Sequence, residues 1–319
     1  MNKLTGVFLD KGSLDTHDLD FHAITSQFRT WKEYDFTEPS QVLDRTLDCD
    51  VVICNKTPLN NSFFNKNTDL KLVCVTATGT NNIDLNAAKI NDVAVCNATK
   101  YATPSVVQHV FSLIISLHNN LINYTKLIEN NAWQSAKHFC LLNYPINELQ
   151  GKSLGIIGYG ELGRAVAETA KAFGLNILIA ESLCGNRNEN RVSLDVLFQQ
   201  SDIISLHCPL TEQSHQLINK ASLSKMKQTA ILINTARGEL VNEKDLLTAL
   251  KEKQISAAGL DVLSSEPPVD NCLLNSPMPN LIITPHIAWA SSQSRQRLIN
   301  QTAENISAFR QNKLRNLVI

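Results

Sequence analysis

Three ionisable residues each follow a separate apolar run in the second half of the sequence. Arg237 follows ILINTA, Glu266 follows GLDVLSS and His286 follows LIITP. Such runs predict buried parallel strands, and ligands bind outside the carboxyl ends of these strands. Arginine offers a planar fork for a carboxylate, while histidine exchanges a proton near neutral pH and is favoured in its charged form by a neighbouring acid. We therefore expect Arg237 to bind a substrate carboxylate, His286 to donate a proton, and Glu266 to orient and charge His286.

Each of these residues also fits a purely structural role. An arginine before Gly238, at a strand-to-helix turn, is common at a surface, and an acid before Pro267 can be a solvated loop residue. A histidine after a proline is often a hydrogen-bonded residue near the core. Their joint occurrence at three strand ends favours one shared site.

A glycine-rich turn lies mid-chain in the stretch GIIGYGELGRAVAETAKAFG. Residues 152–157 predict a buried strand, Gly158, Gly160 and Gly163 follow at once, and residues 161–173 carry apolar residues at helical spacing. The first glycine permits the turn, the second lets a pyrophosphate approach the backbone, and the third lets the helix pack on the strand. This order predicts a dinucleotide site at the helix N-terminus.

A second apolar run, residues 177–180, ends at Glu181. This acid stands 18 residues after Gly163 (181 − 163), close to the spacing of the acid that hydrogen-bonds an adenosine ribose. The pattern predicts NAD rather than NADP as the cofactor. Arg187, in the loop of residues 183–191, lies near the same end and tempers that preference.

His207 stands at the end of another apolar run and is a rival catalytic base. Pro209 directly after Cys208 indicates a tight passage under the cofactor. We therefore assign His207 to a contact on the nicotinamide side.

The elements that must position these residues form two α/β units. We expect doubly wound parallel sheets in both, with a Rossmann nucleotide-binding domain of residues 101–287 inserted into a discontinuous flavodoxin-like substrate domain of residues 1–100 and 288–319. The expected strands are residues 6–9, 51–54, 72–76 and 93–97 in the first unit, and 152–157, 177–180, 203–207, 231–234, 257–262 and 281–284 in the second.

The remaining long segments have distinct characters. Residues 105–128, opened by Thr103 and Pro104, predict one helix that crosses from the first unit into the second. Residues 130–150 have weak periodicity and could form an arm over a partner subunit. Residues 292–309 predict a helix that returns to the first unit.

Composition limits the possible function classes. The 319 residues carry a net charge of −1, so no electrostatic case exists for nucleic acid or an anionic membrane. The N-terminal apolar run is short and no run reaches transmembrane length, from which we expect a cytoplasmic protein. The 8 cysteines are scattered without a CxxC pair and are expected to be reduced core residues, so neither a disulfide framework nor a metal site is expected.

Beyond these patterns, the chain resembles the D-isomer-specific 2-hydroxyacid dehydrogenase family, most closely its glycerate dehydrogenase or hydroxypyruvate reductase branch. The resemblance covers most of the chain. Its motifs are ATGTNNID (77–84), YATPSVVQHV (101–110), GYGELG, SDIISLHCPLT (201–211), INTARGELVNE (233–243), GLDVLSSEPP (259–268) and TPHIAWAS (284–291).

The resemblance implies site residues as well as a fold. It places the backbone N–H groups of Thr78 and Gly79 on the substrate carboxylate and supports the roles of Arg237, Glu266 and His286. It also implies a homodimer built on the nucleotide domains. The cofactor contacts expected from the turn and the resemblance together are Thr103, Gly158, Gly160, Glu161, Leu162, Gly163, Glu181, His207, Cys208, Pro209, Thr235, Ala236 and Asp261.

The expected activity is NADH-dependent reduction of hydroxypyruvate or glyoxylate to D-glycerate or glycolate, and the reverse oxidation. Formate dehydrogenases share the scaffold but pair the histidine with glutamine, so Glu266 argues against that branch. An NAD(H)-sensing corepressor-like binding protein, or a dehydrogenase for another D-2-hydroxy acid such as D-lactate, remains an alternative.

Some positions depart from the family pattern. Lys100 and Glu239 stand where many relatives have glycine, and Glu239 adds a negative charge near an anion site. After Ile319 we expect no regulatory domain of the kind found in the longer phosphoglycerate dehydrogenases.

Overall fold

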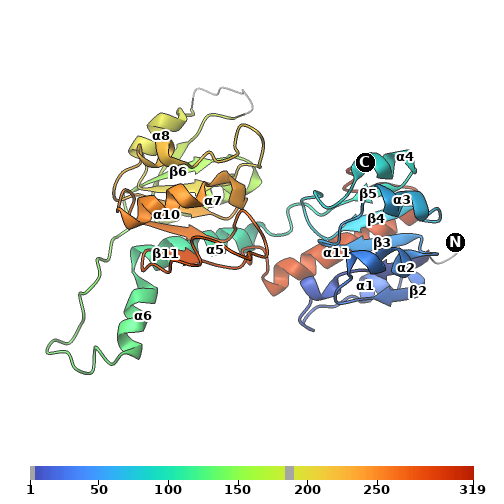
Figure 1. Cartoon of the computed structure of the whole chain (residues 1–319), viewed down its shortest axis with the longest axis horizontal. Coiled ribbons are helices and arrows are strands. Elements are labelled where there is room, and N and C mark those ends of the chain that lie inside the picture. Colours follow the sequence, from blue (N-terminus) through green and yellow to red (C-terminus); the bar gives the residue numbers. More distant parts are fainter. Residues whose placement is uncertain (1–3, 184–189) are drawn as a thin grey trace. The chain divides into compact units, whose positions relative to one another are not determined.

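The computed structural model describes residues 4–183 and 190–319, so Arg187 and Cys184 lie outside the described residues. The chain divides into two units (Figure 1). Unit 1 contains the chain up to Ala102 together with Trp289–Ile319, and unit 2 contains Thr103–Ala288. Both units are parallel-sheet α/β structures, and the expected fold class, with one domain inserted into the other, is confirmed.

The sheet of unit 1 has the strand order β2-β1-β3-β4-β5, which is the flavodoxin-like order. Its strands are β1 (Leu4–Phe8), β2 (Phe28–Glu33), β3 (Val51–Cys54), β4 (Leu72–Val75) and β5 (Ala94–Cys96). Strands β3 and β4 are buried along their whole length, as expected for inner parallel strands with both faces covered. Strand β2 was not expected, because this edge strand reads FRTWKE and buries only Phe28 fully.

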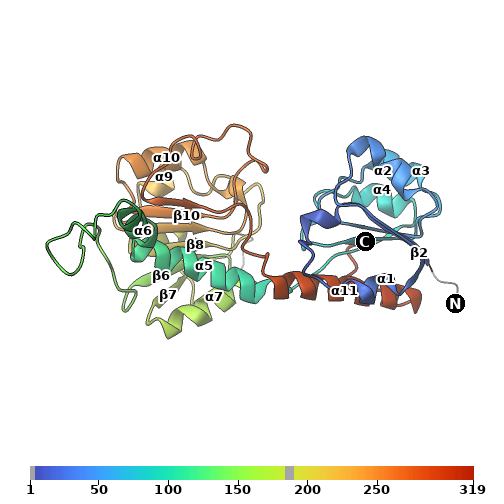
Figure 2. The same cartoon turned by 90° about the horizontal axis from the view of Figure 1, so that it is seen from below.

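Helices cover both faces of this sheet. They are α1 (His22–Thr25), α2 (Val42–Thr46), α3 (Asn61–Lys66), α4 (Leu85–Ile90) and α11 (Ser292–Arg310), with 3-10 turns η1 (Lys11–Ser13) and η2 (Pro39–Gln41). Figure 2 shows α1 and α11 along one face and α2, α3 and α4 on the other. Capping fixes two of the starts, because Asn60 accepts from the Phe63 N–H and Asp84 accepts from the Ala87 N–H.

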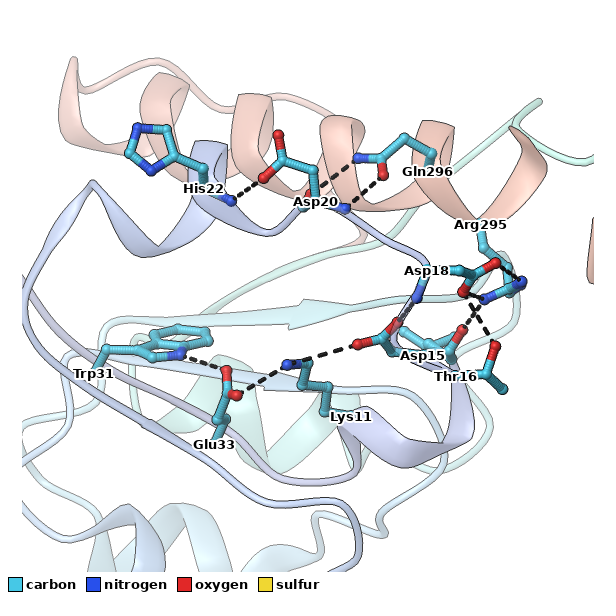
Figure 3. A network of polar contacts seen from close by, with 11 residues as sticks. Lys11, Asp15, Thr16, Asp18, Asp20, His22, Trp31, Glu33, Arg295 and Gln296 are labelled. Atoms are coloured by element: carbon cyan, nitrogen blue, oxygen red, sulfur yellow. Dashed lines mark hydrogen bonds and ion pairs between the residues drawn. The ribbon is translucent and has the colours of Figure 1, made fainter. Parts of the chain in front are cut away.

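A polar network ties the first turn of α11 to the segment that follows β1 (Figure 3). Both guanidinium Nη atoms of Arg295 bond Asp18, each at 2.7 Å, and Nη1 also donates to the Leu14 carbonyl. This two-pronged contact holds the pKa of the Asp18 carboxyl at about 2. The Arg295 Nε donates to the Ala290 carbonyl, so one side chain fixes the start of the helix against two loops.

Unit 2 contains a six-stranded sheet in the order β11-β10-β9-β8-β6-β7. Its strands are β6 (Ser153–Ile157), β7 (Asn176–Ile179), β8 (Ile203–Leu206), β9 (Ile231–Asn234), β10 (Ala257–Leu260) and β11 (Leu281–Ile283), all paired in parallel. Strand β6 has β7 on one side and β8 on the other, so the strand order reverses there. A crevice for a ligand is expected at the carboxyl end of β6.

Helices also cover both faces of the second sheet. They are α5 (Thr103–His118), α6 (Leu121–Glu129), α7 (Glu161–Ala172), α8 (Leu194–Gln200), α9 (Lys220–Leu223) and α10 (Glu243–Lys251), with a 3-10 turn η3 (Gly238–Leu240). In Figure 2, α5 and α7 lie on one side of the sheet and α9 and α10 on the other.

The prediction of a single crossing helix over residues 105–128 was wrong. The segment forms α5 and α6, separated at Asn120, whose backbone is left-handed with φ 51°. Asparagine tolerates this conformation, and its side chain donates to the Pro145 carbonyl at 2.7 Å. Helix α5 lies wholly within unit 2 and begins at the boundary between the units rather than crossing it.

Residues 130–150 form an extended segment without regular secondary structure, which projects from unit 2 after α6 (Figure 1). Its large apolar side chains face outward: Phe139 is 89 % exposed and Trp133 54 %. No helix of the described chain combines the length and apolar character needed to span a bilayer.

Candidate active site

The glycine turn has the geometry that its sequence predicts. Gly158 follows β6 with φ +97°, and a Cβ atom on it would lie 2.3 Å from the Cys208 nitrogen. A Cβ on Gly163 would lie 2.1 Å from the Gly158 carbonyl oxygen. These two glycines therefore allow a left-handed turn that packs tightly against both the segment after β8 and the first turn of α7.

Gly160 differs from the other two glycines. It is the N-cap of α7 with φ −80°, and a Cβ there would meet no protein atom within 4 Å. The protein's own packing thus leaves space at this residue, at the positive end of a twelve-residue helix. This space fits an anionic group that approaches the backbone closely.

Two hydroxyl groups lie among the residues expected to bind the cofactor. The Thr103 hydroxyl, at the start of α5, donates to the Glu161 carboxylate at the start of α7. The Thr235 hydroxyl, after β9, is buried and has no hydrogen-bond partner among the described residues. A buried polar atom without a partner is uncommon, and a bound ligand would satisfy it.

Glu181 follows β7 at the edge of the sheet. Its N–H donates to the Val192 carbonyl at 2.8 Å, and the neighbouring Ala180 forms a bridge with the same residue. The Glu181 carboxylate therefore lies at the carboxyl end of β7, which pairs with β6, the strand that precedes the glycine turn. The Arg191 guanidinium, one residue before Val192, lies 6.0 Å from the centre of the Tyr159 ring.

The segment after β8 contains His207, Cys208 and Pro209. The His207 Nε2 lies 2.9 Å from the Ser205 hydroxyl, and burial lowers the pKa of His207 to about 4. Burial also raises the pKa of the Cys208 thiol to about 11. Both side chains are therefore uncharged at neutral pH.

Arg237 is exposed at the N-cap of η3, and its Nη1 donates to the Ala236 carbonyl at 2.6 Å. Its loop is shaped by Asn234, a fully buried residue that the sequence analysis did not single out. The Asn234 Oδ1 accepts from the Ala236 N–H at 3.0 Å, and its Nδ2 donates to the Arg237 carbonyl at 2.8 Å. An asparagine at the end of a strand is itself a turn signal that could have identified it.

The loops that carry Arg237 and Glu266 are in direct contact. A Cβ on Gly238 would lie 1.9 Å from the Leu263 carbonyl carbon and 2.4 Å from the Ser264 nitrogen. The Leu263 N–H in turn donates to the Glu266 Oε1 at 3.0 Å. Glycine at 238 is thus required by the close approach of the two loops, and not by its φ, which lies outside the left-handed region.

Glu243, in α10, also holds the Glu266 loop through hydrogen bonds. The Glu243 Oε1 accepts from the Ser264 N–H at 2.8 Å, and its Oε2 accepts from the Asn271 side-chain amide at 2.7 Å. Neither Glu243 nor Asn271 was identified from the sequence. Together they fix the chain on both sides of Glu266.

His286 and Glu266 form a hydrogen-bonded pair. The His286 Nδ1 lies 2.6 Å from the Glu266 Oε2, and each side chain is 34 % exposed. Sequence residues twenty positions apart are therefore brought together, and both remain accessible to a ligand. The pair has the geometry of an imidazole whose orientation is set by a carboxylate.

Asp261, expected to contact the cofactor, is 1 % exposed. Its Oδ1 accepts from the Ile287 N–H at 2.9 Å and its Oδ2 from the Ala288 N–H at 2.8 Å. These bonds connect it to the segment that carries His286.

Thr78 and Gly79 follow β4 in unit 1. The Thr78 hydroxyl donates to the Ala98 carbonyl at 2.9 Å, and the Asn97 amide donates to the Thr78 carbonyl at 2.8 Å. Within the described part of the chain, the N–H groups of Thr78 and Gly79 donate to no other protein group. Two fixed backbone donors are therefore available to an anion.

In the described ranges, 4–183 and 190–319, no group of three or more His, Cys, Asp or Glu side chains is placed to hold a metal ion. The seven cysteines described there are free, five of them buried, while Cys140 and Cys272 are only partly buried. Cys272 nevertheless packs against the core of unit 2, so the expectation that the cysteines are core residues was wrong for Cys140, which lies in the exposed segment of residues 130–150.

The parallel sheet that reverses its strand order at β6 and the glycine turn that follows this strand are features of a dinucleotide-binding domain. Residues 111–288 match the NAD-binding domain of the D-isomer-specific 2-hydroxyacid dehydrogenases. The chain belongs to this family and is an NAD-dependent D-2-hydroxyacid dehydrogenase.

Two relatives match nearly the whole chain. It is 40 % identical over 314 residues to a glycerate dehydrogenase of Methylorubrum extorquens, covering 98 % of both chains. It is 37 % identical to a hydroxypyruvate reductase of Blautia hydrogenotrophica, covering 95 % of this chain and 96 % of that one. A solved structure of an acyclic imino acid reductase in complex with NADPH and D-Arg has a TM-score of 0.85 at 27 % identity, covering 99 % and 100 %.

Proposed function

We propose that this dehydrogenase reduces hydroxypyruvate or glyoxylate to D-glycerate or glycolate with NADH, and catalyses the reverse oxidation. The observation that carries the proposal is the His286–Glu266 pair, held in the same unit as the glycine turn and the Arg237 loop. The names of the relatives, glycerate dehydrogenase and hydroxypyruvate reductase, support the substrate class.

In this proposal Arg237 of unit 2 binds the substrate carboxylate, and the backbone N–H groups of Thr78 and Gly79 in unit 1 are further proposed substrate-binding donors. A guanidinium has five N–H donors, so the bond from Arg237 to its own loop leaves donors for a two-pronged contact. The two backbone N–H groups without protein partners supply further donors. A carboxylate held at several points orients the adjacent carbonyl.

His286 holds the proton that the developing alkoxide needs. Because Glu266 accepts the hydrogen on Nδ1, Nε2 is the nitrogen that can deliver a proton to the substrate oxygen. The acid also stabilises the charged imidazole, which is the form required for reduction. Glu266 is itself oriented by the Leu263 N–H, so the pair does not depend on the substrate for its geometry.

His207 does not fit the role of proton donor. With a pKa of about 4 it is neutral at the pH where His286 would act. We assign it to the nicotinamide side of the site, together with Cys208 and Pro209.

The residues of unit 2 fit a bound NAD, which would supply the hydride. The space at Gly160 and the unpartnered Thr235 hydroxyl are the observations that favour this fit. We propose that unit 2 is the nucleotide-binding domain and unit 1 the substrate domain. The proposed cofactor residues are Thr103, Gly158, Gly160, Glu161, Leu162, Gly163, Glu181, His207, Cys208, Pro209, Thr235, Ala236 and Asp261.

Glu181 is the proposed determinant of cofactor preference. A carboxylate ~4 Å from a 2′-phosphate would cost on the order of 1 to 4 kcal/mol at surface-like dielectric constants. An adenosine ribose with a free 2′-hydroxyl would instead donate a hydrogen bond to it.

A panel of 2-keto acids assayed with NADH and NADPH tests this function. We expect turnover of hydroxypyruvate and glyoxylate, with kcat/KM for NADPH lower by at least about tenfold. Glu181→Gln should narrow that difference, while Glu168→Gln, at an exposed acid of α7, should leave it unchanged. Equal kcat/KM for the two cofactors would refute the role of Glu181, and absence of turnover with every keto acid would favour the NAD(H)-sensing alternative.

We further propose a homodimer built on the nucleotide-binding units and a cytoplasmic location. Exposed apolar side chains on the projecting segment of residues 130–150 support the dimer, because large exposed apolar patches mark interfaces. Free cysteines across the described chain are typical of a reducing compartment.

Sedimentation velocity tests the dimer. The double variant Phe139→Ser/Leu142→Ser should sediment as a monomer, whereas Ile90→Ser, at an exposed apolar residue of α4, should not change the sedimentation coefficient. A wild-type protein that is monomeric at micromolar concentration would contradict the proposal.

A further inference from the structure

The segment that carries His286 rests on a chain of three polar side chains, of which Asp261 is buried and His109 and Thr284 are partly buried. His109 lies in α5, Asp261 directly follows β10, and Thr284 directly follows β11. We propose that His109 and Thr284 are positioning residues that act through Asp261 to hold His286 in its catalytic orientation. This inference rests on the proposed role of His286.

The backbone at His286 needs an external support. Its φ is +55°, in the left-handed region that costs a residue with a Cβ atom about 1–2 kcal/mol. Its N–H donates to the Asp261 carbonyl at 2.8 Å, and the next two N–H groups, of Ile287 and Ala288, donate to the Asp261 carboxylate. Three consecutive peptide groups therefore depend on one buried residue.

Thr284 connects this carboxylate to α5. Its hydroxyl donates to the Asp261 Oδ1 at 2.5 Å, which uses the single hydrogen of the hydroxyl. The His109 Nε2, 2.9 Å from the same hydroxyl oxygen, must then be the donor of the second bond. This assignment places a hydrogen on Nε2 of His109, whose distance to the Asp261 Oδ1 is 3.4 Å.

The arrangement restricts Asp261 from two directions. The N–H groups of Ile287 and Ala288 bind one carboxylate oxygen each, and Thr284, which is itself bonded to His109, donates to Oδ1 from the side of α5. Loss of a donor leaves a buried carboxylate less satisfied, and the carboxylate would shift toward other partners. The peptide at His286 would move with it, and the imidazole would turn away from the position set by Glu266.

Such a displacement should appear in the proton-transfer step. Misplacement of a reacting group by about 1 Å can cost up to about a hundredfold in rate. We expect kcat for keto-acid reduction to fall by about tenfold in Thr284→Val and in His109→Leu. Thr284→Ser keeps the hydroxyl and His109→Gln keeps a donor near the Nε2 position, so these matched variants should stay within about threefold of wild type.

The test is a set of kcat measurements for all four variants, in the wild-type and in the His286→Ala background, with NADH affinity from fluorescence titration. We expect the tenfold losses to disappear in the His286→Ala background, because residues that act through one group are not additive. NADH affinity should remain at the wild-type value in every variant.

Three results would overturn the proposal: wild-type kcat in Thr284→Val and His109→Leu, the same fractional loss with and without His286, or a loss that tracks NADH affinity. If Thr284→Val and His109→Leu do not fold, His109→Asn, whose amide is too short to reach Thr284, replaces them. A His286→Ala enzyme with undiminished kcat would refute the proposed role of His286. This result differs from a failed coupling test, in which His286→Ala lowers kcat but the Thr284 and His109 variants lose the same fraction of kcat with and without His286.

Discussion

Replacement of His286 by alanine should lower kcat for keto-acid reduction by roughly a hundredfold or more, the usual contribution of a general acid. That factor corresponds to about 2.7 kcal/mol of transition-state stabilisation. NADH affinity should change little, since the imidazole is bonded to Glu266 and its proposed role is proton transfer. The measurement is steady-state reduction of hydroxypyruvate, with His22→Ala, at an exposed histidine of α1, as the matched control.

The Glu266→Gln variant separates proton donation from simple packing. The glutamine keeps the size of the side chain but removes the carboxylate that binds the His286 Nδ1, so kcat for reduction should fall while NADH affinity is kept. Wild-type kcat in Glu266→Gln would contradict the pair.

Arg237→Lys should impair catalysis although the charge is kept. A lysine is a point charge and cannot reproduce the two-pronged contact of a guanidinium with a carboxylate. We expect KM for the keto acid to rise and kcat to fall, with kcat/KM lower by at least about tenfold, the scale of a lost charge-assisted hydrogen bond.

Steady-state kinetics and NADH titration check this prediction. Arg29→Lys, at an exposed arginine of β2, is the matched control and should behave as wild type. An Arg237→Lys enzyme with wild-type kcat/KM would exclude Arg237 from the substrate site. A loss confined to NADH affinity would indicate that Arg237 binds the cofactor instead of the substrate.

The inner strands were predictable because apolar runs flanked by turns have few alternatives. Strands β3 and β9 begin and end at the expected residues, and most others differ by one or two. Strand β2 was missed because an edge strand with solvent on one side needs no apolar run. The break between α5 and α6 was missed because it depends on a left-handed asparagine and a contact with Pro145, which apolar spacing does not reveal.

The pairing of His286 with Glu266 followed from their places at strand ends, as the sequence analysis expected. The supporting residues could not be found in the same way. Glu243 and Thr284 form side-chain bonds to residues more than twenty positions away in sequence, and His109 contacts Thr284 from a helix 175 residues earlier in the chain. Their partners are defined by the strand order, which the local sequence does not encode.

The discontinuity of unit 1 also has a consequence for how the protein is made. Strands β1 to β5 leave the ribosome before unit 2, yet β5 pairs with residues that follow unit 2: the Val95 N–H donates to the Ile319 carbonyl, and the Val318 N–H donates to the Val95 carbonyl. Helix α11, which covers one face of that sheet, is also translated late. Unit 2 therefore has its whole sequence available while unit 1 still lacks a helix and an edge, so the nascent chain must carry an unfinished sheet through most of its synthesis.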